Sequence, residues 1–217
     1  MLYITSDPHF FHEKILLYEP NRQQVLGKTI EEHDASLLAR INARVKPDDT
    51  LIIAGDFGFS SITGVKEMRK KINCRHVTLI FGNHDKHTPS AYQSAGFSIA
   101  CYEMSIKIAK EYVRIRHHPY RKPWYKVMLP WQWKEKDRKK RPVDRGHFLL
   151  HGHVHGKQEF FIRGRQINIG VDSNNYYPVS LKQLEGIISS QKAKLEKNSL
   201  KYRLKQFFSK KVLICKK

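Results

Sequence analysis

Short apolar runs rich in β-branched residues alternate with longer helical patterns through the first half of the chain, and this alternation limits the possible folds most strongly. Residues 2–5, 50–55 and 77–82 predict buried strands, each followed by an Asp, Gly or Asn that is typical of a turn. Between them, residues 30–45 and 65–72 carry apolar side chains at helical spacing. A strand-helix-strand-helix-strand order of this kind predicts a parallel or mixed sheet with helices outside it.

The second half of the sequence consists of shorter strand-like runs with tight connections. Several of them alternate in polarity, which is typical of half-buried strands. The predicted strands cover residues 98–101, 104–109, 112–116, 147–152, 158–163 and 165–170. We expect them to form a second, more antiparallel sheet packed on the first, followed by a helix that Ser180 caps and whose apolar stripe includes Leu184 and Ile188.

A chain of 217 residues suits one domain with a full hydrophobic core and a tail. We expect the domain at 1–190, with an insertion at 120–146 that holds three prolines and three tryptophans, and a basic tail at 191–217. Three widely spaced cysteines argue against a disulfide framework and against a thiolate metal site. No apolar run reaches the roughly 20 residues of a membrane helix, and the first residues lack the apolar stretch of a signal peptide, so a cytoplasmic location is expected.

The net charge of +20 is concentrated in two stretches. Residues 107–145 carry 14 Lys or Arg against 4 Asp or Glu, and residues 191–217 carry 10 against 1. Two localised basic segments favour contact with a polyanion such as nucleic acid over a merely solubilising surface. Aromatic residues between the basic residues of the insertion would either stack on nucleotide bases or fold onto the core. The tail, where apolar residues alternate with basic ones, fits a helix on a membrane surface, a helix packed on the body or a frayed chain end.

Residues of the types that often bind metal ions or phosphate follow five of the predicted strands directly. In open α/β sheets, ligands gather outside the carboxyl ends of the strands, so residues distant in sequence converge there. One such segment would be weak support, but five in order are hard to explain as packing. The segments are Asp7-Pro8-His9, Gly55-Asp56, Gly82-Asn83-His84-Asp85, His117-His118 and Gly152-His153-Val154-His155.

These five segments resemble the pattern of the calcineurin-like metallophosphoesterases, in which D-x-H, G-D, G-N-H-[DE], H and G-H-x-H occur in this order. The resemblance covers residues 1 to about 188, and the stretches SDPHFFH and NIGVDSNNYYPVSL further resemble small, single-domain bacterial and phage members. It implies an α/β fold with four layers (α/β/β/α), in which helices flank two mixed β-sheets. The insertion and the tail depart from the family pattern, so the resemblance implies little about them.

The resemblance also implies two divalent metal ions and the residues that bind them. Three residues would bind one ion, three others would bind the second, and an aspartate would bridge both. The first set is Asp7, His9 and His155, the second is Asn83, His117 and His153, and the bridging residue is Asp56. Neither His118 nor His151 is expected to be a ligand.

His84 would be the histidine that is not bound to metal. The resemblance implies that it contacts the phosphate, as Asn83 does, and protonates the leaving group, held in orientation by Asp85 or Asp56. His12 and Arg22 lie just beyond the first ligand segment and are further candidates for the substrate phosphate, because Arg suits bidentate contact. A simple surface loop is the alternative for these two residues.

The chemistry of the ligand atoms agrees with these roles independently. Carboxylate, amide and imidazole ligands without thiolate suit Mn, Fe, Zn, Ni or Co, among which we favour Mn. Two ions about 3.5–4 Å apart need a shared anionic ligand, and the two oxygens of Asp56 can span that gap. A water between two such ions loses a proton near neutral pH, and the hydroxide would then attack phosphorus in line.

The sequence therefore predicts a metal-dependent phosphoesterase. The motif leaves open whether a monoester, a diester or a pyrophosphate is cleaved, and the basic segments favour a nucleotide or nucleic acid as substrate. A phosphatase of a non-nucleotide small molecule is the alternative. A non-catalytic scaffold on the same fold has less support, because every ligand position is filled.

Overall fold

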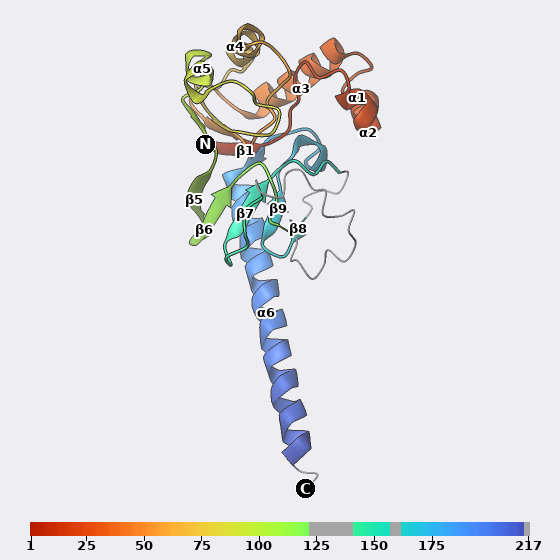
Figure 1. Cartoon of the computed structure of the whole chain (residues 1–217), viewed down its shortest axis with the longest axis vertical. Helices are drawn as coiled ribbons and strands as arrows, with labels where there is room; N and C mark the ends of the chain where they lie inside the picture. Colours follow the sequence, from red (N-terminus) through yellow and green to blue (C-terminus); the bar gives the residue numbers. More distant parts are fainter. Residues whose placement is uncertain (122–140, 157–161, 215–217) are drawn as a thin grey trace.

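The computed structural model describes residues 1–121, 141–156 and 162–214, with the side chains described as far as residue 200. Two five-stranded sheets pack on each other, and a long C-terminal helix extends beyond them (Figure 1). Most of the insertion that the sequence predicts at 120–146 lies outside the described residues.

The first sheet consists of four parallel strands and one antiparallel edge strand. β1 and β2 align Ile4 with Ile52, and β2 and β3 align Ile52 with Thr78, so the carboxyl ends of these strands lie at one edge. The order is β10 (Val179–Ser180), β1 (Leu2–Thr5), β2 (Thr50–Ile53), β3 (His76–Ile80) and β4 (Ile99–Cys101).

The expectation that residues 98–101 belong to the second sheet is wrong. They form β4, which pairs in parallel with β3 and aligns Ile99 with Thr78. The cause is α5 (Pro89–Ser94), a short helix between β3 and β4 whose six residues are too few to show a helical period. It completes one more β-α-β connection of the first sheet.

The second sheet is mixed, as the resemblance implied. β5 pairs with β6 and β8 with β9 in antiparallel orientation, while β6, β7 and β9 run parallel. The order is β5 (Met104–Ile108), β6 (Glu111–Ile115), β7 (Phe148–His151), β9 (Gln166–Asn168) and β8 (Ile162–Arg163). The predicted strand at 158–163 is described only for its last two residues.

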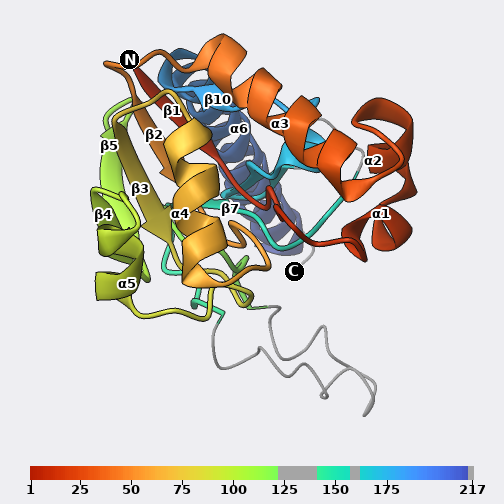
Figure 2. The ribbon, with the colours of Figure 1, turned by 90° about the horizontal axis from the view of Figure 1, so that it is seen from above.

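Helices cover the first sheet on the side away from the second. α3 (Ile30–Arg44) begins with a capping box between Thr29 and Glu32, and the Ser61 side chain caps α4 (Ile62–Lys71). In Figure 2, α3 and α4 lie on one side of the first sheet and α6 on the other. Two short helices that the sequence pattern did not predict precede α3, namely α1 (Ile15–Tyr18) and α2 (Pro20–Val25), and the 3₁₀ turn η3 (Val171–Ser173) follows β9.

The core has two parts, one on each face of the first sheet. Leu51 and Ile53 face the helices, whereas Ile4, Ile52 and Ile80 face the second sheet, as the two-residue period of strands requires. Both faces are largely buried, which agrees with the predominantly apolar residues of these strands. The α/β fold with two mixed sheets and flanking helices is thereby confirmed.

The C-terminal helix α6 (Leu181–Ile214) begins where the sequence predicts. Ser180 Oγ accepts a hydrogen bond from Gln183 N–H, and Gln183 Oε1 accepts one from Ser180 N–H. Leu184 and Ile188 are fully buried in the core between the sheets. The helix continues without a break into the segment that the sequence predicts as a tail. No helix in the described part of the chain is both long and apolar enough to cross a membrane.

Candidate metal centre

The five ligand-bearing segments meet at the carboxyl ends of β1, β2, β3, β6 and β7. Backbone hydrogen bonds hold adjacent segments together. Asp7 N–H donates to Gly55 O at 3.0 Å, His9 N–H donates to Asp56 O at 3.0 Å, and Gly152 N–H donates to the His117 carbonyl at 3.0 Å. The side chains of these segments are therefore placed by the two sheets and do not depend on a long loop.

Asp7, His9 and His155 form the first group of potential metal ligands, with one ligand atom of each within 4.8 Å of the others. His9 Nε2 is buried and has no hydrogen-bond partner among the described residues. His155 Nδ1 donates to Asp172 Oδ2 at 2.8 Å, which leaves Nε2 for a metal. These are the three residues that the resemblance assigned to one ion.

The second group gathers around the Asn83 side chain. Asn83 Oδ1 lies 2.9 Å from His117 Nε2 and 3.0 Å from His153 Nδ1. His117 Nδ1 donates to the Ala54 carbonyl at 3.1 Å, so Nε2 faces the site. His118 also contributes a ring nitrogen to the group of His117 and His153. It was not expected as a ligand, and its only sequence signal was its place next to His117.

Asp56 lies between the two groups. Its Oδ2 atom is 3.6 Å from His9 Nε2 and 3.3 Å from His117 Nε2. Its Oδ1 atom accepts a hydrogen bond from His84 N–H at 2.9 Å. One buried carboxylate thus faces a histidine of each group, which is the position that a bridging ligand needs.

Buried charges set the protonation of the site. Burial raises the pKa of Asp7. Burial alone would also raise the pKa of Asp56, but His117 and His9 hold it well below its usual range. Burial would lower the pKa of His117, yet the Asp56 and Asp7 carboxylates raise it to about 9. Metal binding near neutral pH therefore has to displace a proton from His117.

Four of the predicted ligands have strained backbones. Asp7, His9, Asp56 and His153 adopt the left-handed region, with φ of 59°, 54°, 53° and 66°. Such a conformation costs about 1–3 kcal/mol for a residue with a side chain and persists only where the surroundings impose it. It turns the chain sharply after each strand and directs the side chain into the site.

Two glycines make room for the carboxylates. A Cβ atom on Gly82 would lie 2.1 Å from Asp56 Oδ1, and one on Gly152 would lie 2.0 Å from Asp7 Oδ2. Both distances are far below van der Waals contact. The glycines of G-N-H-D and G-H-V-H are therefore required because the backbone passes directly against Asp56 and Asp7.

His84 and His12 lie at the edge of the metal centre. The His84 side chain is 31% exposed, and its Nε2 atom is 3.9 Å from Asp56 Oδ2. The His12 ring stacks on Phe59 with a centroid distance of 4.3 Å, and Phe59 also contacts the His84 ring at 4.6 Å. The sequence pattern did not indicate Phe59, which is positioned here to support both imidazoles.

Asp85, predicted to orient His84, contacts the backbone. Its carboxylate accepts hydrogen bonds from the N–H groups of Asp56, Phe57 and Gly82 at 2.8, 3.0 and 2.8 Å. Burial and the nearby Asp56 raise the pKa of Asp85 to about 6. These contacts connect the loop after β2 to the loop after β3, so Asp85 positions Asp56.

Arg22 was expected at the substrate, and the structure places it beneath the site instead. Its side chain is fully buried, with Nε and Nη2 donating to Asp172 at 2.8 and 2.7 Å. It also donates to the backbone carbonyls of Asp7 at 2.9 Å and Pro8 at 3.1 Å. Asp172, which the sequence pattern did not single out, thus connects Arg22 to His155; its only signal was its place shortly after a predicted strand.

We expect Asp172→Asn to lower the free energy of unfolding by about 3–5 kcal/mol, because it leaves the buried guanidinium of Arg22 without a counterion. Metal affinity should fall about 10–100-fold, since the neutral amide oxygen is a weaker acceptor than the carboxylate for the hydrogen bond that orients His155. Chemical denaturation and metal titration measure the two effects. Asp48→Asn is the matched control, because Asp48 makes an exposed ion pair with Arg75, and such pairs contribute about 0–1 kcal/mol. Equal effects of the two substitutions would contradict the role of Asp172.

The described geometry agrees with comparisons to known proteins. The model of the calcineurin-like phosphoesterases matches residues 2–198, and the chain belongs to this family of phosphoester-cleaving enzymes. The chain is similar to the gene 66 protein of Mycobacterium phage L5, with 28% identity over 79% of this chain and 86% of that protein.

Solved structures are similar as well. A protein of unknown function from Aquifex aeolicus, AQ665, matches with 27% identity and a TM-score of 0.60, over 87% of this chain and 99% of that one. A novel archaeal phosphodiesterase matches with 17% identity and a TM-score of 0.37, over 78% and 81% of the two chains. The first of these similarities extends over nearly the whole fold.

Proposed function

We propose that this protein is a dinuclear metal-dependent phosphohydrolase that acts on a nucleotide or a nucleic acid. The observation that carries the proposal is the position of Asp56, whose Oδ2 atom lies between His9 and His117 and so between two groups of potential ligands. An ion pair with His117 alone would not require the same carboxylate to face His9 of the other group as well.

The residues fit a pair of divalent ions. The donors are carboxylate, amide and imidazole, which suit Mn first and also Fe, Zn, Ni or Co. The buried Nε2 atom of His9 makes no hydrogen bond to the described residues and lies 3.6 Å from Asp56 Oδ2, which supports its role as a ligand atom. Asp7, His9 and His155 would bind one ion and Asn83, His117 and His153 the other, with Asp56 shared and His118 available beside the second.

Two bound ions would activate a water molecule as nucleophile and neutralise charge that develops on the phosphoryl oxygens. Protonation of the leaving group would be the role of His84, which is partly exposed and whose Nε2 atom lies 3.9 Å from Asp56 Oδ2. Burial lowers the pKa of His84 in the free protein. A bound phosphate opposes that effect by its negative charge, so His84 gains a proton together with the substrate and can donate it to the leaving oxygen. Asn83 and His12 are placed to contact the phosphate.

The substrate class is tested by a hydrolysis screen of the metal-free protein reloaded with Mn. The panel contains mononucleotides, cyclic nucleotides, single-stranded DNA and RNA, and nitrophenyl phosphate monoesters and diesters. We expect cleavage of at least one nucleotide or nucleic-acid substrate, and loss of that cleavage after dialysis against a chelator. Turnover of non-nucleotide esters alone would favour the small-molecule phosphatase. If the screen is repeated with Fe, Zn, Ni and Co, no turnover with any of the five metals would favour the non-catalytic scaffold.

A further inference from the structure

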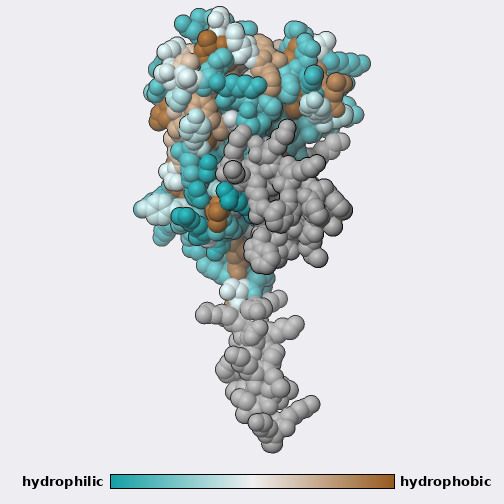
Figure 3. All heavy atoms as spheres, in the orientation of Figure 1, coloured by the Kyte–Doolittle hydropathy of each residue, from teal (hydrophilic) through white to brown (hydrophobic). Residues whose placement is uncertain are grey.

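A second concave site lies on the face of the second sheet that points away from the first. The alternation along β6 creates it, because Val113 and Ile115 face the core between the sheets while Tyr112 and Arg114 face outward. The segment after residue 141 forms the opposite wall. The cavity has a volume of about 480 Å³, and hydrophilic residues dominate the described surface at the level of this sheet (Figure 3).

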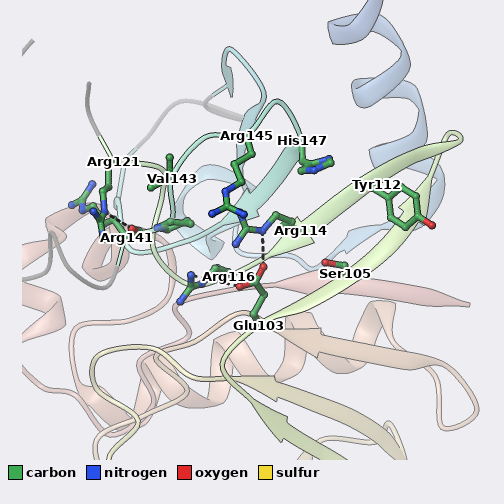
Figure 4. A pocket seen from close by; sticks show the side chains of 11 residues that line it. Glu103, Ser105, Tyr112, Arg114, Arg116, Arg121, Arg141, Val143, Arg145 and His147 are labelled. Atoms are coloured by element: carbon green, nitrogen blue, oxygen red, sulfur yellow. Dashed lines mark hydrogen bonds and ion pairs between the residues drawn. The ribbon is translucent and has the colours of Figure 1, made fainter. Parts of the chain in front are cut away.

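Arginines dominate the lining of this groove, as Figure 4 shows. Among the described residues that line the groove, Glu103 is the only carboxylate, and it pairs with both Arg114 at 2.5 Å and Arg116 at 3.5 Å. One negative charge is therefore shared by two guanidinium groups. The arginines that line the groove are Arg114, Arg116, Arg121, Arg141 and Arg145. Even without Arg121 and Arg141, the three arginines Arg114, Arg116 and Arg145 outnumber Glu103, and this excess of positive charge favours an anion as occupant.

The arrangement of the groove suits a chain of phosphates. Arg114 and Arg116 are two residues apart along an extended backbone, which separates them by roughly 6.6 Å and lets each meet a different phosphate. The guanidinium group matches phosphate oxygens with two parallel hydrogen bonds. Tyr112 lies at the end of this row and is 59% exposed; Lys107 Nζ lies over one face of its ring, 5.1 Å from the centroid, so a base would stack on the other face.

We propose that this groove binds a single-stranded nucleic acid, with the arginines on the phosphates and Tyr112 stacked on a base. A flat lipid surface does not fit a concave groove. An acidic peptide would use the arginines but not the exposed aromatic face. Binding does not depend on catalysis, since no residue of the groove belongs to the metal centre.

The groove is also close in sequence to the metal centre, because Arg116 directly precedes His117. A strand bound along β6 toward its carboxyl end would thus reach the side of the proposed second metal group. Only the link between the groove and the metal centre rests on the proposed function. If both hold, the groove would guide a bound nucleic acid to the metal centre of the same chain.

The experiment measures fluorescence anisotropy of a labelled oligothymidylate of about 12 nucleotides with the full chain in EDTA. The groove variant is Arg114→Gln with Arg145→Gln. Its matched control is Lys70→Gln with Lys71→Gln, which removes the same charge from the exposed end of α4. We expect the groove variant to weaken binding at least about tenfold and to reduce the slope of log affinity against log salt by about 1.4, and the control to change affinity less than about twofold.

A second variant tests stacking. Tyr112→Leu should weaken binding about tenfold, whereas Tyr112→Phe, which keeps the ring, should restore it. Thermal unfolding of each variant checks that the fold is intact. Equal losses in the groove variant and the lysine control would overturn the proposal, as would tighter groove-dependent binding of a polyglutamate peptide or of anionic lipid vesicles. Because EDTA excludes turnover, loss of binding and loss of hydrolysis are read separately.

Discussion

Asp56→Asn is expected to reduce kcat/KM by at least about 10³-fold while the protein keeps its fold. Asparagine has the shape of aspartate, but it carries no charge and offers one oxygen in place of two. It cannot offset the repulsion between two cations on either side of it. Removing one neutral hydrogen-bond donor that stabilises a transition state lowers kcat by about 10²–10³-fold. The loss of a shared anionic metal ligand should have a larger effect.

Elemental analysis and steady-state kinetics with Mn measure this effect on whichever substrate the hydrolysis screen identifies. Bound metal should fall below two ions per chain. Asp48→Asn, at an exposed carboxylate, should leave kinetics and metal content unchanged. An Asp56→Asn enzyme that kept two ions and a tenth or more of the activity would rule out a bridging role for Asp56.

Most strands and helices of the fold could be predicted because the spacing of apolar residues is a local property of the sequence. In β2, successive side chains alternate between two buried faces: Leu51 and Ile53 face the helices, and Ile52 faces the second sheet. The run of apolar residues identifies this strand without knowledge of its neighbours. The strand Ile99–Cys101 was assigned to the wrong sheet because three residues carry no information on their pairing. That information lies in α5, whose single turn and a half has too few residues to show a pattern.

The convergence of the five segments could be predicted for a different reason, whereas the roles of single ligands came from the resemblance. Parallel strands end at one edge, so a rule about strand ends converts five separate segments into one site. The rule does not extend to residues that support the ligands. Asp172 reaches His155 and Arg22 only through η3, which follows β9, and the burial of Arg22 depends on how α2 folds back beneath Asp7. Those contacts come from packing and leave no trace in local spacing.

Arg22 shows why the role of a supporting residue could not be predicted from the sequence. An arginine next to a phosphate site suggests a substrate contact, because most arginines are exposed and Arg pairs well with phosphate. Here the backbone carbonyls of Asp7 and Pro8 and the Asp172 carboxylate satisfy its donors inside the protein. The guanidinium group that could bind a phosphate instead stabilises the strained turn at Asp7.

The substitution His84→Gln should affect substrates unequally, and this inequality distinguishes a general acid from a residue that only supports the site. An ester with an alkyl leaving group needs a proton on the departing oxygen, and its kcat/KM should fall about 10²–10⁴-fold. A nitrophenyl ester of the same phosphate releases a stable anion without that proton, so its kcat/KM should fall less than about tenfold. The measurement is the ratio of the two kcat/KM values. His76→Gln, at an exposed histidine at the start of β3, is the control and should leave both unchanged. Equal losses on the two esters would show that His84 binds phosphate or supports the metal centre without transferring a proton, because only proton transfer to the leaving group makes the loss depend on that group.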